Sequence, residues 1–112
     1  MTETDEIRDR PLGLFRRLLR AGQLPRSPEQ CHELRNAPAE VTPRTPGCED
    51  HRPEDGLVVH LRLCLACGHV GCCDSSVPRH ATAHHAATGH PVIRSHELGE
   101  AWRWCYVHEL LG

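Results

Sequence analysis

The sequence has few of the residues from which a chain of 112 residues usually builds its interior. Aromatic residues make up only 4% of the chain and apolar residues 38%, so the hydrophobic core must be small. A domain of this size buries a modest fraction of its surface and often needs a further source of stability. Nine glycines and nine prolines also indicate many turns rather than long regular elements. We therefore expect one small domain whose stability depends on something besides apolar packing.

The sequence also lacks a long apolar run. No stretch approaches the ~20 apolar residues that span a membrane. The N-terminus, MTETDEIRDR, is acidic, and Arg16 and Arg17 interrupt the apolar stretch at residues 12–19, so we identify no secretion signal. We therefore expect a soluble chain in a reducing cytoplasm. The formal net charge of −2 provides no large basic field, which makes nucleic acid a poor candidate partner.

Cysteine and histidine, in contrast, are abundant. The chain has seven cysteines and ten histidines. Disulfides are the alternative interpretation of the cysteines, but their number is odd and Cys64 and Cys67 form a C-x-x-C pair. The absence of a secretion signal also argues against disulfides. Metal binding is therefore the expected source of the missing stability.

The local patterns predict an α+β domain, in which a short antiparallel sheet packs with one main helix. Residues 1–30 are expected to form an N-terminal extension, and residues 31–112 the domain. Within the extension, a short amphipathic helix is expected at residues 11–21. We favour a helix that packs on its own domain or is frayed in solution. The alternative is a helix that docks on a membrane surface or on a partner. We expect irregular loop at residues 23–55.

The second half of the chain has clearer signals. β-branched residues and alternation predict a strand at residues 57–64, and a tight turn follows in which Gly68 adopts positive φ. Ser75 or Ser76 is expected to cap the main helix, with Pro78 in its first turn and its end near Gly89. Short extended segments are expected at residues 91–94 and 101–107.

The potential metal ligands occur mainly in closely spaced pairs. Zinc prefers four thiolate or imidazole ligands in a tetrahedron, usually supplied as pairs from two pieces of chain. Five pairs within so short a sequence, with two further single candidates, predict structural zinc. The pairs are Cys31 with His32, Cys48 with His51, Cys64 with Cys67, His80 with His84, and Cys105 with His108, and the single candidates are Cys72 and His90.

Three runs of sequence carry a family resemblance. The runs CLACGHVGC at residues 64–72, RHATAHHAATGHP at 79–91 and WCY at 104–106 resemble the UBP-type zinc finger. This domain occurs in deubiquitinases, in a ubiquitin-binding histone deacetylase and in stand-alone bacterial proteins. The resemblance covers residues 31–108, and the wording CCDSS is most similar to the bacterial members.

The resemblance implies how the ligands pair, which their spacing alone does not. It implies two or three zinc ions and leaves Cys73 as an odd thiol. In the third set, His32 directly follows Cys31, whereas the family usually has one residue between the two ligands, and Glu33 occupies the expected histidine position. The alternative for this set is that its members are ordinary surface groups. The implied sets are Cys48, His51, Cys72 and His80; Cys64, Cys67, His84 and His90; and Cys31, His32, Cys105 and His108.

We do not expect an enzyme. His80 and His84 have the spacing of a zinc peptidase motif, but Ala81 stands where the catalytic glutamate of H-E-x-x-H would be. Four protein ligands on each ion would also leave no position for a reacting water. The C-x-x-C pair at Cys64 and Cys67 lacks the βαβ context of a thioredoxin-type redox site.

Binding is the expected function, and the partner is an unidentified protein or peptide. Many members of the family that this sequence resembles bind the C-terminal tail of ubiquitin. Here Arg62 falls at an aromatic position of that site, and Asp74 falls at its arginine position, where it would repel a carboxylate. Ubiquitin is therefore an unlikely partner. The first hypothesis is a zinc-stabilised interaction module, and the alternative is a metal- or redox-responsive regulator that uses Cys73 or the third zinc set. The residues expected to bind the partner are Arg62, Trp102, Trp104 and Tyr106.

Overall fold

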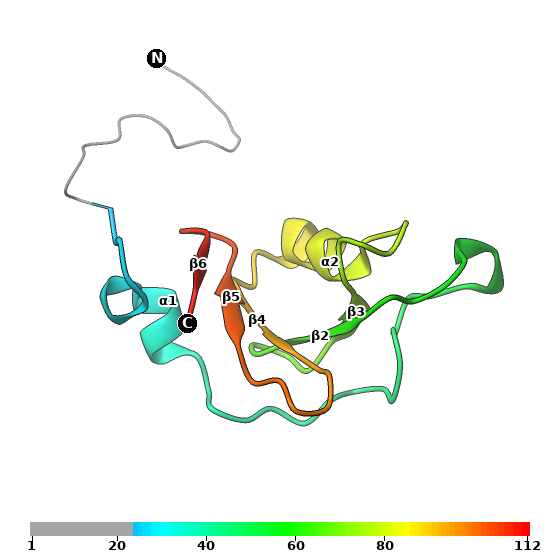
Figure 1. Ribbon diagram of the computed structural model, residues 1–112, viewed down its shortest axis with the longest axis horizontal. Helices are drawn as coiled ribbons and strands as arrows, with labels where there is room; N and C mark the ends of the chain where they lie inside the picture. The colour runs from blue at the N-terminus through cyan, green and yellow to red at the C-terminus, as the bar shows by residue number, and fades with distance from the viewer. Residues whose placement is uncertain (1–23) are drawn as a thin grey trace, which may run out of the picture.

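The computed structural model describes residues 24–112 of the chain. The helix predicted at residues 11–21, and most of the predicted N-terminal extension, lie outside these residues. Within the described part, no helix is long and apolar enough to cross a membrane. The elements, shown in Figure 1, are η2 Pro28–Gln30, α1 His32–Asn36, η3 Pro53–Asp55, β2 Leu61–Cys64, β3 Val70–Cys72, α2 His80–Thr88, β4 Val92–Ser95, β5 Arg103–Cys105 and β6 Leu110–Leu111.

The five strands form one antiparallel sheet in the order β3-β2-β4-β5-β6. The register places Leu63 of β2 opposite Val70 of β3 on one side and Arg94 of β4 on the other. The main helix, α2, contacts β3 and β2, whereas the short helix α1 contacts β5 at the other end of the sheet (Figure 1). The α+β class and the short antiparallel sheet with one main helix are confirmed.

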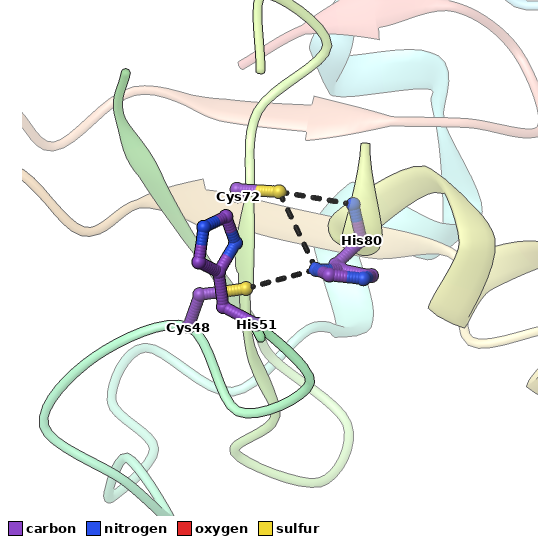
Figure 2. Close-up of side chains that lie close together, drawn as sticks. All are labelled: Cys48, His51, Cys72 and His80. Carbon is purple, nitrogen blue, oxygen red and sulfur yellow. Dashed lines mark hydrogen bonds between the residues drawn. The ribbon is translucent and has the colours of Figure 1, made fainter. Parts of the chain in front are cut away.

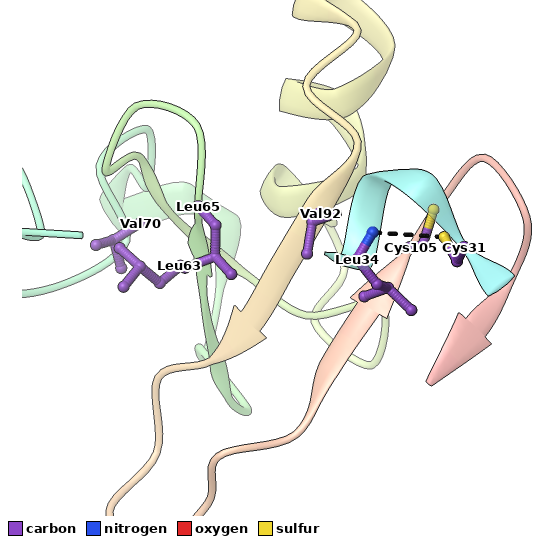
Figure 3. Packing of buried hydrophobic residues seen from close by; sticks show 7 residues of the cluster. All are labelled: Cys31, Leu34, Leu63, Leu65, Val70, Val92 and Cys105. Atoms are coloured by element: carbon purple, nitrogen blue, oxygen red, sulfur yellow. Dashed lines mark hydrogen bonds between the residues drawn. The ribbon is translucent and has the colours of Figure 1, made fainter. Parts of the chain in front are cut away.

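The core is as small as the composition predicts. It has one cluster of seven buried residues, drawn in Figure 3. Two members of the cluster are cysteines, so thiols fill space that leucine or valine would fill in a larger core. The thiols therefore belong to the packed interior and not to the surface. The members are Cys31, Leu34, Leu63, Leu65, Val70, Val92 and Cys105.

Two predicted strands are shorter in the structure than in the prediction. The strand expected at residues 57–64 begins at Leu61, and the one expected at 101–107 is limited to β5. Residues 57–59 continue beyond the sheet, where Leu57 is 87% exposed. The Val59 N–H donates a hydrogen bond to the Ser76 hydroxyl oxygen at 2.8 Å. A side chain therefore supplies the acceptor that a neighbouring strand would supply within a sheet.

Two helix predictions also need correction. The main helix begins at His80 and not at Ser75 or Ser76, because Arg79 has a left-handed φ of 48° and breaks the helical path. Its end at Gly89 is as expected, with φ 77° and the N–H donated to the His85 carbonyl. The region predicted to be irregular contains α1, which the Cys31 thiol caps by accepting the Leu34 N–H at 3.5 Å.

Two glycines bring the metal-ligand candidates together. Gly71 lies in β3, and a Cβ at this position would be 2.6 Å from the backbone nitrogen of Ala81. The first turn of α2 therefore lies directly on the strand, and the His80 N–H donates to the Cys72 thiol at 3.2 Å. Gly68 has a φ of 87°, as predicted for the turn, and its carbonyl accepts the Arg44 N–H at 2.9 Å.

Candidate metal centres

Three groups of potential metal ligands occur in the described part of the chain. In each group, one donor atom per residue lies within 4.8 Å of every other. Two of the groups contain the quartets that the family resemblance implies, and the third differs at one position. The groups are Cys48, His51, Cys72 and His80; Cys64, Cys67, His84 and His90; and Cys31, Glu33, Cys105 and His108.

The first group, shown in Figure 2, joins a loop, a strand and a helix. Cys48 and His51 precede η3, Cys72 ends β3, and His80 begins α2. The Nδ1 atom of His80 lies 3.2 Å from the Cys48 Sγ and 3.6 Å from the Cys72 Sγ. Its Nε2 atom lies 3.9 Å from the Asp55 carboxylate, so a negative charge faces the outer side of this ring.

The His51 ring provides the sharpest test of whether a cation fits this group. Its Nε2–H donates to the Gly56 carbonyl at 2.6 Å, which fixes the tautomer and leaves a lone pair on Nδ1. That Nδ1 atom is buried and has no hydrogen-bond partner in the described structure. A buried imidazole nitrogen without a partner is costly, and a metal ion bound by its lone pair removes that cost. The residues present therefore fit a metal ion.

The second group is formed by the turn after β2 and by the main helix. The Cys67 Sγ lies 3.3 Å from the His84 Nε2, and the Cys64 Sγ lies 3.6 Å from the His90 Nδ1. The two histidine nitrogens are themselves 3.3 Å apart. His80 and His84 are one helical turn apart on α2, yet each belongs to a different group. One helix therefore connects the first two groups.

A second connection between these groups runs through His69. This ring is buried and stacks on the His84 ring, with centroids 4.0 Å apart and an interplanar angle of 2°. Its Nε2–H donates to the Asp50 carboxylate at 2.7 Å, and Asp50 lies between Cys48 and His51 in the chain. Sequence reasoning treated His69 as an ordinary histidine, although its place between two ligand cysteines was a usable signal.

The third group lies between α1 and the last strands. Both of its thiols, Cys31 and Cys105, are completely buried. The His108 Nδ1 atom lies 3.0 Å from the Glu33 carboxylate, 3.5 Å from the Cys31 Sγ and 4.0 Å from the Cys105 Sγ. These four residues therefore converge from two segments, residues 31–33 and 105–108, that are far apart in the sequence.

The structure corrects the inclusion of His32 in this group. Its side chain is in a hydrogen-bonding contact with Asn36, with the His32 Nδ1 3.1 Å from the Asn36 Nδ2. Successive residues of a helix point about 100° apart, so only one of the two residues after Cys31 can face the sheet. That residue is Glu33, and His32 is exposed.

Burial affects the chemistry of the thiols. It is the largest cause that raises the pKa of Cys48, Cys64 and Cys105, the last to about 11, because the thiolate is poorly solvated there. A metal ion must therefore displace these protons when it binds. Two cysteine thiolates and two histidine imidazoles, as in the first two groups, form a donor set that zinc prefers.

The four residues expected to bind a partner lie around one cavity of about 310 Å³. Arg62, Trp102, Trp104 and Tyr106 all line it. The Arg62 guanidinium lies over the Trp102 ring, with its central carbon 4.5 Å from the ring centroid. Asp74 and Cys73 line the same cavity.

Cys73 belongs to none of the three groups, as expected for the odd thiol. It is 6% exposed, and its Sγ lies 3.9 Å from the Ser76 hydroxyl. Burial acts to raise its pKa, but hydrogen bonds with the backbone of Ser75 and His60 outweigh burial and hold that pKa below its ordinary value. The alternatives of a buried apolar residue and an exposed thiol are thus resolved in favour of burial.

Comparison with known proteins agrees with this arrangement. Residues 47–109 match the model of a family described as the Zn-finger in ubiquitin-hydrolases and other protein. The chain is also similar to the solution NMR structure of the protein RPA1320 from Rhodopseudomonas palustris, with 47% sequence identity and a TM-score of 0.64. That likeness covers 72% of this chain and 78% of the other. No curated protein sequence gives a significant match.

The contact between His69 and His84 generates a prediction about metal affinity. Replacing a residue that orients a ligand typically weakens metal binding about 10- to 100-fold. His69→Ala removes both the stacked ring and the hydrogen bond to Asp50, so we expect a loss of that size at the Cys64 group. Competition with a chromogenic zinc chelator measures it. His96→Ala, which changes a histidine outside all three groups, is the control, and equal affinities for the two variants would contradict the prediction.

Proposed function

Because the chain belongs to the family of Zn-fingers found in ubiquitin hydrolases and other proteins, we propose that it binds three zinc ions that hold together a non-catalytic peptide-binding module. The family and the clusters of cysteine and histidine both indicate zinc binding. The number of ions is our inference from the number of ligand groups. The observation that carries the proposal is that the described residues contain three four-residue ligand groups and, apart from them, a cavity lined by aromatic and charged side chains.

Four protein donors in each group support a structural role for zinc. A catalytic zinc usually keeps one coordination position for water, and each of these groups can fill all four. With two thiolates and two neutral imidazoles, each of the first two sites would be electrically neutral. The third site would carry one net negative charge, since the Glu33 carboxylate takes the place of an imidazole.

The cavity supports the binding part of the proposal. Trp102 is 36% exposed, and the Arg62 guanidinium lies over its ring, so an aromatic surface and a cation are both presented at the cavity. Arg62 stands on β2 and Trp104 on β5, with β4 between them, and the turn that carries Asp74 forms another part of the wall. A cavity of this volume suits one or two side chains of a peptide rather than a large cofactor.

The same wall argues against a partner that presents a free C-terminal carboxylate. Asp74 lines the cavity with a negative charge. Like charges that meet across an interface without compensation are destabilising. A ubiquitin-type tail is therefore not the occupant that we propose.

The alternative function, a metal- or redox-responsive regulator, has one supporting observation. Cys73 lies outside the metal groups and lines the cavity. Its exposure of only 6% limits the access of an oxidant, so we favour the binding module.

The third group generates a prediction about zinc stoichiometry. Glu33→Ala removes one donor of this group, whereas His32→Ala removes an exposed imidazole from the neighbouring position. We expect purified wild-type protein and His32→Ala to contain three zinc ions per chain, and Glu33→Ala to contain two after dialysis against a mild chelator. Elemental analysis measures the ratio. Loss of an ion from His32→Ala but not from Glu33→Ala would contradict the proposed ligand set.

The cavity generates a prediction about peptide binding. Peptides selected from a random display library on the zinc-loaded protein are expected to bind at least about tenfold more weakly to Trp104→Ala, because buried aromatic anchors carry much of an interface's energy. Val107→Ala is the matched control, since Val107 is 54% exposed and does not line the cavity. Unchanged binding to a Trp104→Ala variant that retains its zinc would contradict the proposed site.

A further inference from the structure

Asp74 is a charged group without a charged partner in the described part of the chain. It is exposed on the cavity wall, and none of the ion pairs among the described residues includes it. Its one side-chain hydrogen bond there is accepted from the Thr82 hydroxyl at 2.6 Å, through Oδ1. The Oδ2 atom is therefore available to a ligand.

The neighbours of Asp74 fix its carboxylate at the cavity. Thr82 stands on α2, and its hydroxyl oxygen lies 3.3 Å from the Tyr106 hydroxyl, which can donate to it because the Thr82 proton is directed at Asp74. The Tyr106 ring stacks on His85, with centroids 4.3 Å apart. A tyrosine phenol is neutral at neutral pH, so Tyr106 adds no second negative charge.

The positive charge across the cavity already has partners. Arg62 donates to the Leu61 carbonyl at 3.0 Å, contacts the Ser95 hydroxyl at 3.5 Å, and lies over Trp102. Ser95 in turn donates to the Glu100 carboxylate at 2.6 Å. This hydrogen bond, and to a lesser extent the nearby Arg62 charge, lowers the pKa of Glu100, which therefore stays negative near Arg62. Arg62 is thus partly compensated, whereas Asp74 is not.

The rest of the wall suits a long cationic side chain. Trp104 and Tyr106 provide aromatic surfaces that attract a guanidinium or ammonium group, and Ile93 and Ala81 provide apolar contact for an aliphatic stem. An arginine combines a planar head for stacking with the fork of N–H groups that pairs with a carboxylate.

From this combination we propose that the cavity recognises an arginine side chain of a partner peptide, with the guanidinium at Asp74 and against the Trp104 and Tyr106 rings. The inference rests on the proposed peptide-binding function and specifies its ligand. It predicts selectivity by charge, because citrulline has nearly the same shape as arginine but no charge. Lysine, which lacks the planar fork, is expected to bind more weakly than arginine.

The test uses three acetylated and amidated pentapeptides, Gly-Gly-X-Gly-Gly, in which X is arginine, citrulline or glutamate. Each is titrated into the full-length zinc-loaded protein and followed by the indole N–H resonances of Trp102 and Trp104. We expect the arginine peptide to bind about tenfold more tightly than the citrulline peptide, a difference of about 1.4 kcal/mol. Asp74→Asn should abolish this difference, and Glu54→Gln, which removes an equal charge from an exposed site outside the cavity, should preserve it.

The outcomes separate this inference from the function on which it rests. Equal binding of the arginine and citrulline peptides, or an arginine preference that survives Asp74→Asn, overturns the inference but leaves the cavity as a peptide site. Preferential binding of the glutamate peptide also overturns it and indicates recognition by Arg62. If no peptide shifts the indole resonances at millimolar concentration, the inference and the proposed binding site both fail.

Discussion

Six cysteine thiols and the histidine imidazoles beside them form three ligand clusters, and the rest of the structure is arranged around these clusters. The apolar cluster has only seven residues, two of which are themselves thiols of the third group. Such a core contributes little, whereas a structural zinc site is worth on the order of 10 kcal/mol in small peptides, comparable with the net stability of a whole domain. The Nδ1 atom of His51 illustrates how the fold depends on metal. It is buried without a hydrogen-bond partner, so its burial is destabilising unless a cation binds it.

The metal groups also build the cavity. Cys72 and His80 hold the two ends of the turn that carries Asp74, so closing the first group fixes where that carboxylate lies. Trp104 and Tyr106 flank Cys105 in the chain. Since side chains alternate along a strand, Cys105 faces the buried third group while its neighbours face the cavity. The binding surface that we propose is therefore a consequence of metal coordination as well as of the sheet.

The two quartets with Cys48 and with Cys64 were predictable from the sequence because the family resemblance supplied their pairing. The structure adds the reason that this pairing is possible, since the glycines at positions 68 and 71 permit the close approach that it needs. Sequence reasoning failed where the outcome depended on backbone direction. The start of α1 at His32 decides that Glu33 faces the sheet, and nothing in the run Cys-His-Glu reveals where a helix of five residues begins. The later start of α2 was also not predictable, since the capping signals at Ser75 and Ser76 do not reveal the left-handed conformation of Arg79, after which the helix begins.

The central claim is that metal coordination holds this fold together, and removal of the metal tests it most directly. A strong chelator is added in excess to the native protein at neutral pH, and far-UV and near-UV circular dichroism are recorded while the zinc content is measured by elemental analysis. The account predicts that both spectra change together, with loss of the sheet and of the ordered environment of Trp104, and that added zinc restores them. Unchanged spectra in protein shown to be free of metal would contradict it.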